Sequence, residues 1–334
     1  MKPFLSIISI CVFLLFSCTP KDKIHLVRGE AQGSTYAIKY VSHSDEALKP
    51  AIDSILEVID LSMSTYRPES LISKINRGER ITIDPHFEKV FLASQIIWQQ
   101  SEGAFDPTVG VLVNAWGFGK EKHSRNLTKN QIDSLKQFVG FEKIRLTDGK
   151  YIEKQHSAIF FDFNAIAQGY TVDVIADFLK SKGIENFIIE VGGELFLSGQ
   201  NTVENKKWTI GIENPTLADE NQLIATVQFS NQGLATSGNY RKIRTDALTG
   251  EKFVHSINPK TGLAKQSNLL SATVITDSSM YADGYATMLM VLGLEESKKF
   301  LEKHTNLHVL LVYNNENNEI KTFETEGFKK LSMN

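Results

Sequence analysis

Residues 160–173 read FFDFNAIAQGYTVD, and residues 187–199 read FIIEVGGELFLSG. A short apolar run ends at Asp162, helical spacing begins near Ala167, and a second apolar run leads into a glycine pair. This order predicts a strand, a turn, a helix and a second strand, with a carboxylate, the unpaired N–H groups of the helix start and the glycine turn at one end. The arrangement favours a phosphate-bearing ligand, and the alternative is a purely structural unit with a tight turn.

The first 17 residues are predicted to be a signal peptide outside the fold. Lys2 precedes an apolar run over residues 4–16, which is too short to span a bilayer but typical of the core of a signal peptide. The run ends in Leu-Phe-Ser-Cys, which resembles the lipobox of bacterial lipoproteins. Cys18 is therefore predicted to be the lipidated first residue of the mature chain, and residues 18–26 to be a tether. The alternative is an ordinary secretory signal with a coincidental cysteine.

The composition excludes several classes of function. The chain has 36 Lys and Arg against 39 Asp and Glu, a formal net charge of −3, which gives no electrostatic basis for binding nucleic acid. Of the two cysteines, Cys11 lies in the predicted signal peptide. An internal disulfide, a cysteine metal site and thiol catalysis are therefore excluded for the mature chain.

Alternating strand and helix signals predict one α+β unit over residues 27–334. Strand patterns flank Gly33, and the helical spacing is found over residues 45–63, 87–101 and 279–294. Strand pairs are predicted for 208–213 with 223–229 and for 309–313 with 319–323. Residues 233–240, GLATSGNY, are predicted to form a small-residue turn whose hydroxyl and N–H groups suit an anion.

Two aromatic segments are candidates for holding a planar ligand. Tyr66 lies in a loop that a proline two residues later keeps out of helical geometry. There it is either a ligand platform or a surface or packing residue. The glycine-rich segment after residue 103 contains Phe105, Trp116 and Phe118, which suit a flat ring, with core filling around a bend as an equal alternative.

Three later residues are candidates for the chemistry itself. Asp283 and Thr287 are four residues apart on a predicted helix, so they share a face, and their oxygens suit a hard cation such as Mg²⁺. Hydrogen bonding within the helix start is the alternative. His255 precedes the turn NPKTG, which would fix its ring as a base near neutral pH, and a structural histidine is the alternative.

Together, eight segments resemble the ApbE family of FAD:protein FMN transferases, and the resemblance extends over residues 27–308. Each segment alone is weak, but eight in the family's order are specific. In chain order they are GSTY (33–36), SMSTY (62–66), GAFDPTVGVLV with WGFG (103–119), DFNAIAQGYTVD (162–173), EVGGEL (190–195), ATSGNYR (235–241), HSINPKTG (255–262) and ADGYATML (282–289).

The resemblance implies a Mg²⁺-dependent, exported and lipid-anchored enzyme. Its fold would be an ApbE-like, T-fold-like α+β unit, compact and two-lobed, with mostly antiparallel sheets and packed helices. Such an enzyme cleaves the pyrophosphate of FAD, transfers FMN to a threonine hydroxyl of a target protein through a phosphoester bond, and releases AMP. The implied targets are covalent-FMN subunits of membrane electron-transfer complexes, met on the periplasmic face of the bacterial inner membrane. The alternatives are an FAD pyrophosphatase that gives free FMN and a lipid-anchored flavin-binding protein without turnover.

The resemblance also assigns roles to individual residues. It implies that the carbonyl of Ala165 joins Asp283 and Thr287 at Mg²⁺, and that His255 is the base. Two of the residues implied at the FAD site, Gln32 and Gln168, stand where methionine and lysine are usual in the family. The full set implied to contact FAD is Gln32, Tyr66, Trp116, Gly117, Phe118, Asp162, Gln168, Thr236, Ser237 and Ile257.

Overall fold

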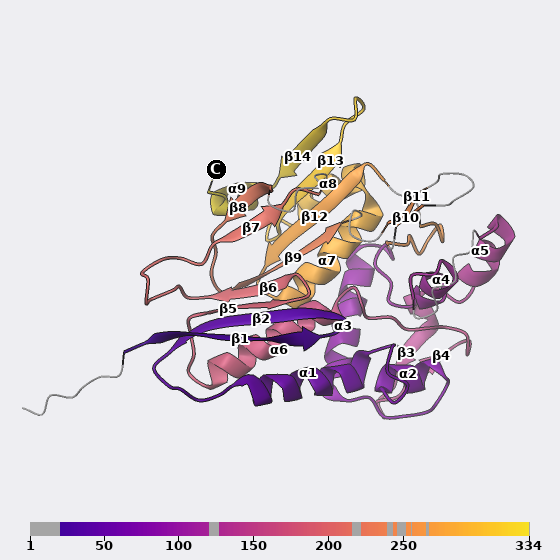
Figure 1. Cartoon of the computed structure of the whole chain (residues 1–334). Helices are drawn as coiled ribbons and strands as arrows, with labels where there is room; N and C mark the ends of the chain where they lie inside the picture. The colour runs from indigo at the N-terminus through magenta and orange to yellow at the C-terminus, as the bar shows by residue number, and fades with distance from the viewer. Residues whose placement is uncertain are drawn as a thin grey trace, which may run out of the picture.

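An antiparallel eight-stranded sheet forms the centre of the fold (Figure 1). The computed structural model describes residues 21–119, 127–215, 222–238, 243–245, 252–254, 256–264 and 267–333. In spatial order the strands of the sheet are β1 (Lys23–Ala31), β2 (Ser34–Ser42), β5 (Phe187–Val191), β6 (Glu194–Ser198), β9 (Gln232–Gly238), β12 (Leu269–Thr276), β13 (His308–Asn314) and β14 (Ile320–Glu324).

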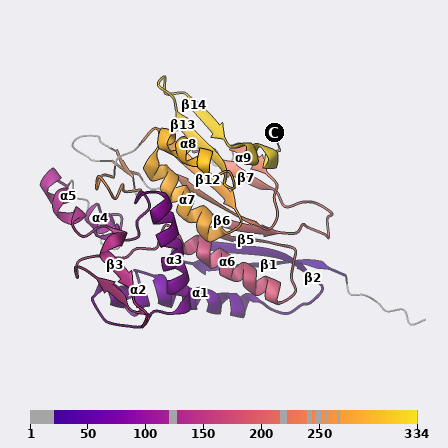
Figure 2. The same ribbon diagram turned by 180° about the vertical axis from the view of Figure 1, so that it is seen from behind.

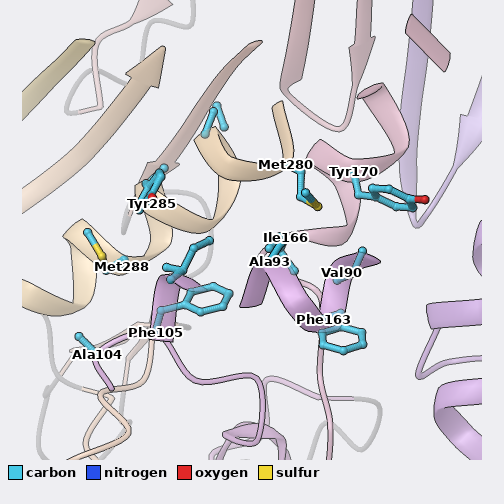
Figure 3. Close-up of a cluster of buried hydrophobic side chains, with 14 of the residues drawn as sticks. Val90, Ala93, Ala104, Phe105, Phe163, Ile166, Tyr170, Met280, Tyr285 and Met288 are labelled. Atoms are coloured by element: carbon cyan, nitrogen blue, oxygen red, sulfur yellow. The ribbon is translucent and has the colours of Figure 1, made fainter. Parts of the chain in front are cut away.

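Long helices lie on one face of this sheet, as the view from behind shows (Figure 2). They are α1 (Lys49–Met63), α3 (Pro85–Gln100), α6 (Ala167–Ser181) and α7 (Ser279–Leu292). Figure 3 shows part of the core that they enclose, to which Val90 and Ala93 of α3 and Met280 and Tyr285 of α7 belong. In the part of the chain that the structure describes, no helix combines the length and the apolarity that crossing a membrane requires.

A second layer covers the opposite face of the sheet. It contains the hairpin of β7 (Ile210–Glu213) and β8 (Leu223–Val227) and the C-terminal helix α9 (Glu326–Leu331). Leu197 of β6, Ile212 of β7 and Phe328 of α9 are buried together in this layer. The remaining elements are α2 (Leu71–Asn76), α4 (Gly110–Ala115), α5 (Lys129–Lys136), a 3₁₀ turn (Phe141–Lys143), β3 (Ile144–Leu146), β4 (Ile152–Lys154), β10 (Ile243–Thr245), β11 (Lys252–Val254) and α8 (Leu294–Lys303).

The predicted α+β class with mostly antiparallel strands is confirmed, but the tether is shorter than predicted. Strand β1 begins at Lys23, which pairs with Ser42, so residues 23–26 are part of the sheet. The strand extends this far because Ile24 packs with Val41 in the second layer.

The strand predicted to end at Asp162 is not formed, although the helix and the strand after it are. Phe160 makes a single isolated bridge with Val109. The side chain of Asn76 instead satisfies the backbone of Phe161, since it accepts from the N–H at 2.7 Å and donates to the carbonyl at 2.9 Å. A side chain from α2 thus replaces the neighbouring strand that this segment would need.

The turn predicted over residues 233–240 is also wrong for its described part. Residues 232–238 form β9, which pairs with β6 and β12 in the middle of the sheet. The small residues are explained by packing, because a Cβ on Gly233 would lie 2.3 Å from the backbone nitrogen of Ser279 in α7. The strand therefore contains a glycine at the point where α7 crosses it closely.

Candidate active site

Asp283 lies where α7 crosses the start of α6. The residue is 5% exposed, and its Oδ2 accepts a hydrogen bond from the backbone N–H of Gly169 at 3.1 Å. Burial raises the pKa of this carboxyl to about 7. Among the described residues the other carboxylate oxygen makes no hydrogen bond. A buried carboxylate with an available oxygen is suited to be the charged ligand of a cation.

Thr287 lies one turn after Asp283, on the same side of α7. Its hydroxyl is 3.1 Å from the hydroxyl of Ser237 in β9. The structure therefore brings Thr287 beside Ser237, with Asp283 one turn earlier on the same helix, and their roles at a metal and phosphate site stay predictions. The alternative for Asp283, a hydrogen bond within its own helix start, is not what is observed, because its partner belongs to α6.

Thr236 does not share this space with Ser237, because successive residues of a strand point to opposite faces. Its hydroxyl pairs with that of Thr273 at 2.9 Å, and it lines a cavity of ≈ 490 Å³ on the β7 face of the sheet. Gly192 and Gly193 line the same cavity. The two adjacent hydroxyls predicted to line one site thus lie on different sides of β9.

The predicted glycine turn does lie against the start of α6. Gly192 and Gly193 have φ of 66° and 110° and connect β5 to β6. A Cβ on Gly192 would lie 2.3 Å from Nε2 of Gln168, so this side chain rests on the turn.

The N–H groups at the start of α6 are mostly not available to a ligand. The N–H of Ala167 donates to the carbonyl of Phe163 at 2.8 Å, and that of Gly169 donates to Asp283. The prediction of an unpaired helix start that binds phosphate is therefore wrong for these two groups.

Gln32 also contacts α6. Its Nε2 donates to the hydroxyl of Thr171 at 2.7 Å, and that hydroxyl donates to the carbonyl of Ala167. The residue has φ 53° in the turn between β1 and β2, and its buried Oε1 has no hydrogen-bond partner among the residues that the structure describes. The glutamine thus presents an unsatisfied acceptor close to the start of α6.

Tyr66 and Asp162 lie close enough to interact electrostatically. Tyr66 is 50% exposed, and burial together with the charge of Asp162 raises its pKa. The carboxylate of Asp162 accepts from the backbone N–H of Asn164 at 2.8 Å and so shapes the turn that carries Ala165. An exposed ring at this position is compatible with the platform interpretation of Tyr66.

Trp116 and Ile257 are buried, at 2% and 5% exposure. They pack in one cluster with Leu112 of α4, and Phe118 packs against its edge. The indole N–H of Trp116 donates to the carbonyl of Gly262 at 2.8 Å. Of the two interpretations of the aromatic loop, core filling matches this geometry. Gly117, with φ of 78°, follows the end of α4.

Cys18 and His255 lie outside the described residues, so the lipidation and base assignments stay predictions. The turn after His255 is well defined. The Oδ1 of Asn258 accepts from the N–H of Lys260 at 2.9 Å and of Thr261 at 3.1 Å. This pattern matches the rigid turn predicted from the sequence.

One buried carboxylate beside the site was missed. Asp106 is 6% exposed and accepts from the N–H and hydroxyl of Thr108 and from the N–H of Phe141. Burial raises its pKa to about 6. The pattern Asp-Pro-Thr at 106–108, typical of a turn closed by its first side chain, is the signal that could have revealed it.

Within the described ranges, no three His, Cys, Asp or Glu side chains gather in a metal-binding group. A cation at Asp283 would therefore be held by fewer than three such side chains of the described residues, and the hydroxyl of Thr287 is a neutral oxygen on the same side of α7. An oxygen set of this kind suits Mg²⁺ rather than a transition metal.

Comparison with known proteins identifies the family. The profile of the ApbE family matches residues 32–311. The FAD:protein FMN transferase of Haemophilus influenzae is 35% identical and aligns over 99% of each chain, and that of Vibrio cholerae is 33% identical over 95% of this chain and 96% of its own.

Solved structures agree with the sequence comparison. The flavin transferase ApbE from Vibrio cholerae superposes with a TM-score of 0.82 at 32% identity, covering 93% of this chain and 100% of that one. The apo flavinyl transferase ApbE of Pseudomonas stutzeri gives 0.83 at 31% identity, covering 93% and 97%. The family profile, the relatives that align over nearly the whole chain and the solved structures all point to the same family. The chain belongs to the ApbE family.

Proposed function

We propose that this chain transfers the FMN part of FAD to a threonine hydroxyl of a target protein, with release of AMP. The observation that carries the proposal is the buried carboxylate of Asp283 with its available oxygen, beside the hydroxyls of Thr287 and Ser237. Relatives that bear the name FAD:protein FMN transferase align over nearly the whole chain. A buried carboxylate is stabilised by a cation, and a cation at the pyrophosphate neutralises the charge that develops when it is cleaved.

The residues present fit Mg²⁺. Asp283 would supply the charge, and the hydroxyl of Thr287 and the carbonyl of Ala165 would supply neutral oxygens. When bound, Mg²⁺ neutralises pyrophosphate charge and stabilises the leaving phosphate.

In the reaction, the threonine oxygen of the acceptor bonds to the phosphorus next to riboflavin. The bond from that phosphorus to the bridging oxygen breaks, and AMP leaves with the electron pair. The proton of the threonine passes to His255, which we assign as base because the turn fixed by Asn258 follows it directly.

The flavin and nucleotide would lie along the region that joins Tyr66, Asp162 and Gln168. Tyr66 offers an exposed ring, and Gln168 rests on the turn at Gly192. We further propose export and anchoring through lipidated Cys18 on the periplasmic face of the inner membrane. There the acceptors would be the covalent-FMN subunits of membrane electron-transfer complexes.

The function is tested by incubating the purified chain with FAD, Mg²⁺ and an acceptor domain that carries a target threonine. Acceptor-bound FMN with AMP supports the proposal. Free FMN with AMP indicates an FAD pyrophosphatase, and intact bound FAD indicates a binding protein. The matched control is the same acceptor with its target threonine replaced by alanine.

A further inference from the structure

The helices α6 and α7 exchange carboxylate contacts at their first turns. Asp283 of α7 accepts from the N–H of Gly169, in the first turn of α6, at 3.1 Å. Asp173 of α6 accepts from the N–H of Ser279 at 2.8 Å and from that of Met280 at 3.0 Å, both in the first turn of α7. Each helix therefore provides the carboxylate that caps the other.

The four-residue spacing on each helix makes the two caps parts of one contact between α6 and α7. Gly169 and Asp173 are four residues apart on α6, and Ser279 and Asp283 are four apart on α7. Each pair lies on one face of its helix, one turn apart. The two hydrogen-bonded contacts thus fix both the separation and the register of the helices along one turn.

Asp173 also accepts a hydrogen bond from a third donor. The hydroxyl of Ser278, the residue before α7, donates to its Oδ2 at 2.6 Å. Three donors from three successive residues therefore converge on one carboxylate, and hydrogen bonds to a charged acceptor are among the strongest in proteins.

Close packing leaves the start of α7 little room to move. A Cβ on Gly169 would lie 2.2 Å from the carbonyl oxygen of Ser279, and a Cβ on Gly233 of β9 would lie 2.3 Å from its nitrogen. The hydroxyl of Ser279 donates to the carbonyl of Leu195 in β6 at 2.8 Å. The first turn of α7 is thus held by α6 on one side and by the sheet on the other.

We infer that Asp173 is a positioning residue of the active site: it fixes the first turn of α7 and thereby places Asp283 and Thr287 relative to Ala165. The inference rests on the proposed function, since it assigns those three residues to the metal. Asp173 itself would not touch the metal or FAD. It acts on residues one and two turns away through the backbone of α7, in the way that outer contacts orient metal ligands.

The test compares Asp173→Asn with Asp177→Asn. The amide is nearly isosteric but has one acceptor oxygen for the three donors. Asp177 lies on the same helix one turn later and is exposed, so the control changes the same charge away from α7. Three quantities are measured for each: Mn²⁺ affinity by calorimetry, the Mg²⁺ concentration for half-maximal AMP release at saturating FAD, and Tm.

Asp173→Asn should raise both metal constants by about 10- to 100-fold, the usual effect of removing an outer contact of a metal site. Its rate at saturating Mg²⁺ should recover toward the wild-type rate, and Asp177→Asn should match wild type. A lower Tm with unchanged metal constants would overturn the inference and leave Asp173 a purely structural cap.

A second variant decides the question if Asp173→Asn does not fold. Ser278→Ala removes one of the three donors and should raise the metal constants by about fivefold, the value of one hydrogen bond. Ser278→Ala also removes the cap of α7, because the hydroxyl of Ser278 accepts from the N–H of Tyr281. Its control is therefore Thr325→Ala, which removes the corresponding cap of α9, where the threonine side chain accepts from Phe328. Equal metal constants for Ser278→Ala and wild type would contradict the inference.

Failure of the proposed function gives a different result. A wild-type chain that binds Mn²⁺ but releases no AMP from FAD contradicts the function, while the calorimetric comparison still decides the role of Asp173. A wild-type chain that neither binds Mn²⁺ nor cleaves FAD overturns both.

Discussion

The backbone N–H of Gly169 donates to Oδ2 of Asp283 across 3.1 Å, and residue 169 has no space for a side chain. The contact joins residues 114 positions apart in the chain. It directs one oxygen of the buried carboxylate into α6 and leaves the other for a ligand. The absence of a Cβ is what allows the two helices to come this close.

Gly169→Ala should therefore disturb the metal site as well as the fold. The added Cβ would lie 2.2 Å from the carbonyl oxygen of Ser279 and 2.8 Å from Cβ of Asp283, so the helices must separate. We expect a loss of about 1–3 kcal/mol in the free energy of unfolding, measured by urea denaturation, and a higher Mg²⁺ requirement for AMP release.

The control for this prediction is Gly183→Ala. Gly183 has φ of 74°, and its added Cβ would meet nothing within 4 Å, so the substitution strains the backbone away from the site. It should lower stability with an unchanged Mg²⁺ requirement. An equal Mg²⁺ requirement for Gly169→Ala and wild type would refute the role of the close approach.

Tyr66→Ala should weaken FAD binding with little effect on stability. The ring is 50% exposed, so its removal costs little buried area. Loss of one aromatic face for the ligand should raise the Kd for FAD by about tenfold, measured by fluorescence titration. Tyr66→Phe keeps the ring and should bind as wild type does. Wild-type affinity in the alanine variant would show that Tyr66 is a surface residue only.

Trp116→Phe should have the opposite effect, with lower stability and unchanged FAD binding. The indole is buried and donates to the carbonyl of Gly262, so the variant loses packing and a buried hydrogen bond. We expect a loss of about 1–3 kcal/mol of stability, seen as a lower Tm, and an unchanged Kd for FAD in the folded protein. A large rise in that Kd without a change in Tm would restore the flavin-contact interpretation of Trp116.

The sequence predicted elements whose signals are local. The start of α6 and the turn at Gly192 were predicted because helical spacing and a glycine pair mark them within a few residues. The prediction of a strand that ends at Asp162 was wrong because the backbone of Phe161 is hydrogen-bonded by the side chain of Asn76. That residue lies 85 positions earlier in the chain. The small residues of β9 predict a turn, but they reflect the helix packed on Gly233, which composition alone does not show.

The candidate site likewise combines residues with a local signal and contacts without one. Asp283 and Thr287 were found because four-residue spacing places two oxygens on one helix face. The opposite orientations of Thr236 and Ser237 follow from their being in a strand, which the sequence interpretation did not predict. The contacts of Asp173 with α7 span 105 to 107 residues and have no local signal.

Asp106 should give the protein a specific pH dependence. Burial raises its pKa from 3.8 to about 6 in the folded state, so the folded state binds this proton over a range where the unfolded state does not. The free energy of unfolding should therefore fall as the pH rises from near 3.8 to about 6, by up to about 3 kcal/mol. Urea denaturation at several pH values measures it.

Asp106→Asn should lack this part of the slope, whereas Asp133→Asn, on the exposed face of α5, should keep it. Parallel profiles for Asp106→Asn and wild type would contradict the assignment. The comparison between variants is needed because other carboxylates also contribute to the pH dependence of stability. Their contributions cancel when the profile of a variant is subtracted from that of wild type.

The most direct test of the account counts AMP and acceptor-bound FMN in the same reaction of the purified chain with FAD, Mg²⁺ and a threonine-bearing acceptor. The account predicts one AMP for each FMN attached to the acceptor threonine, and neither product with Asp283→Asn. AMP released with free FMN and an unmodified acceptor, or undiminished transfer by Asp283→Asn, would contradict it.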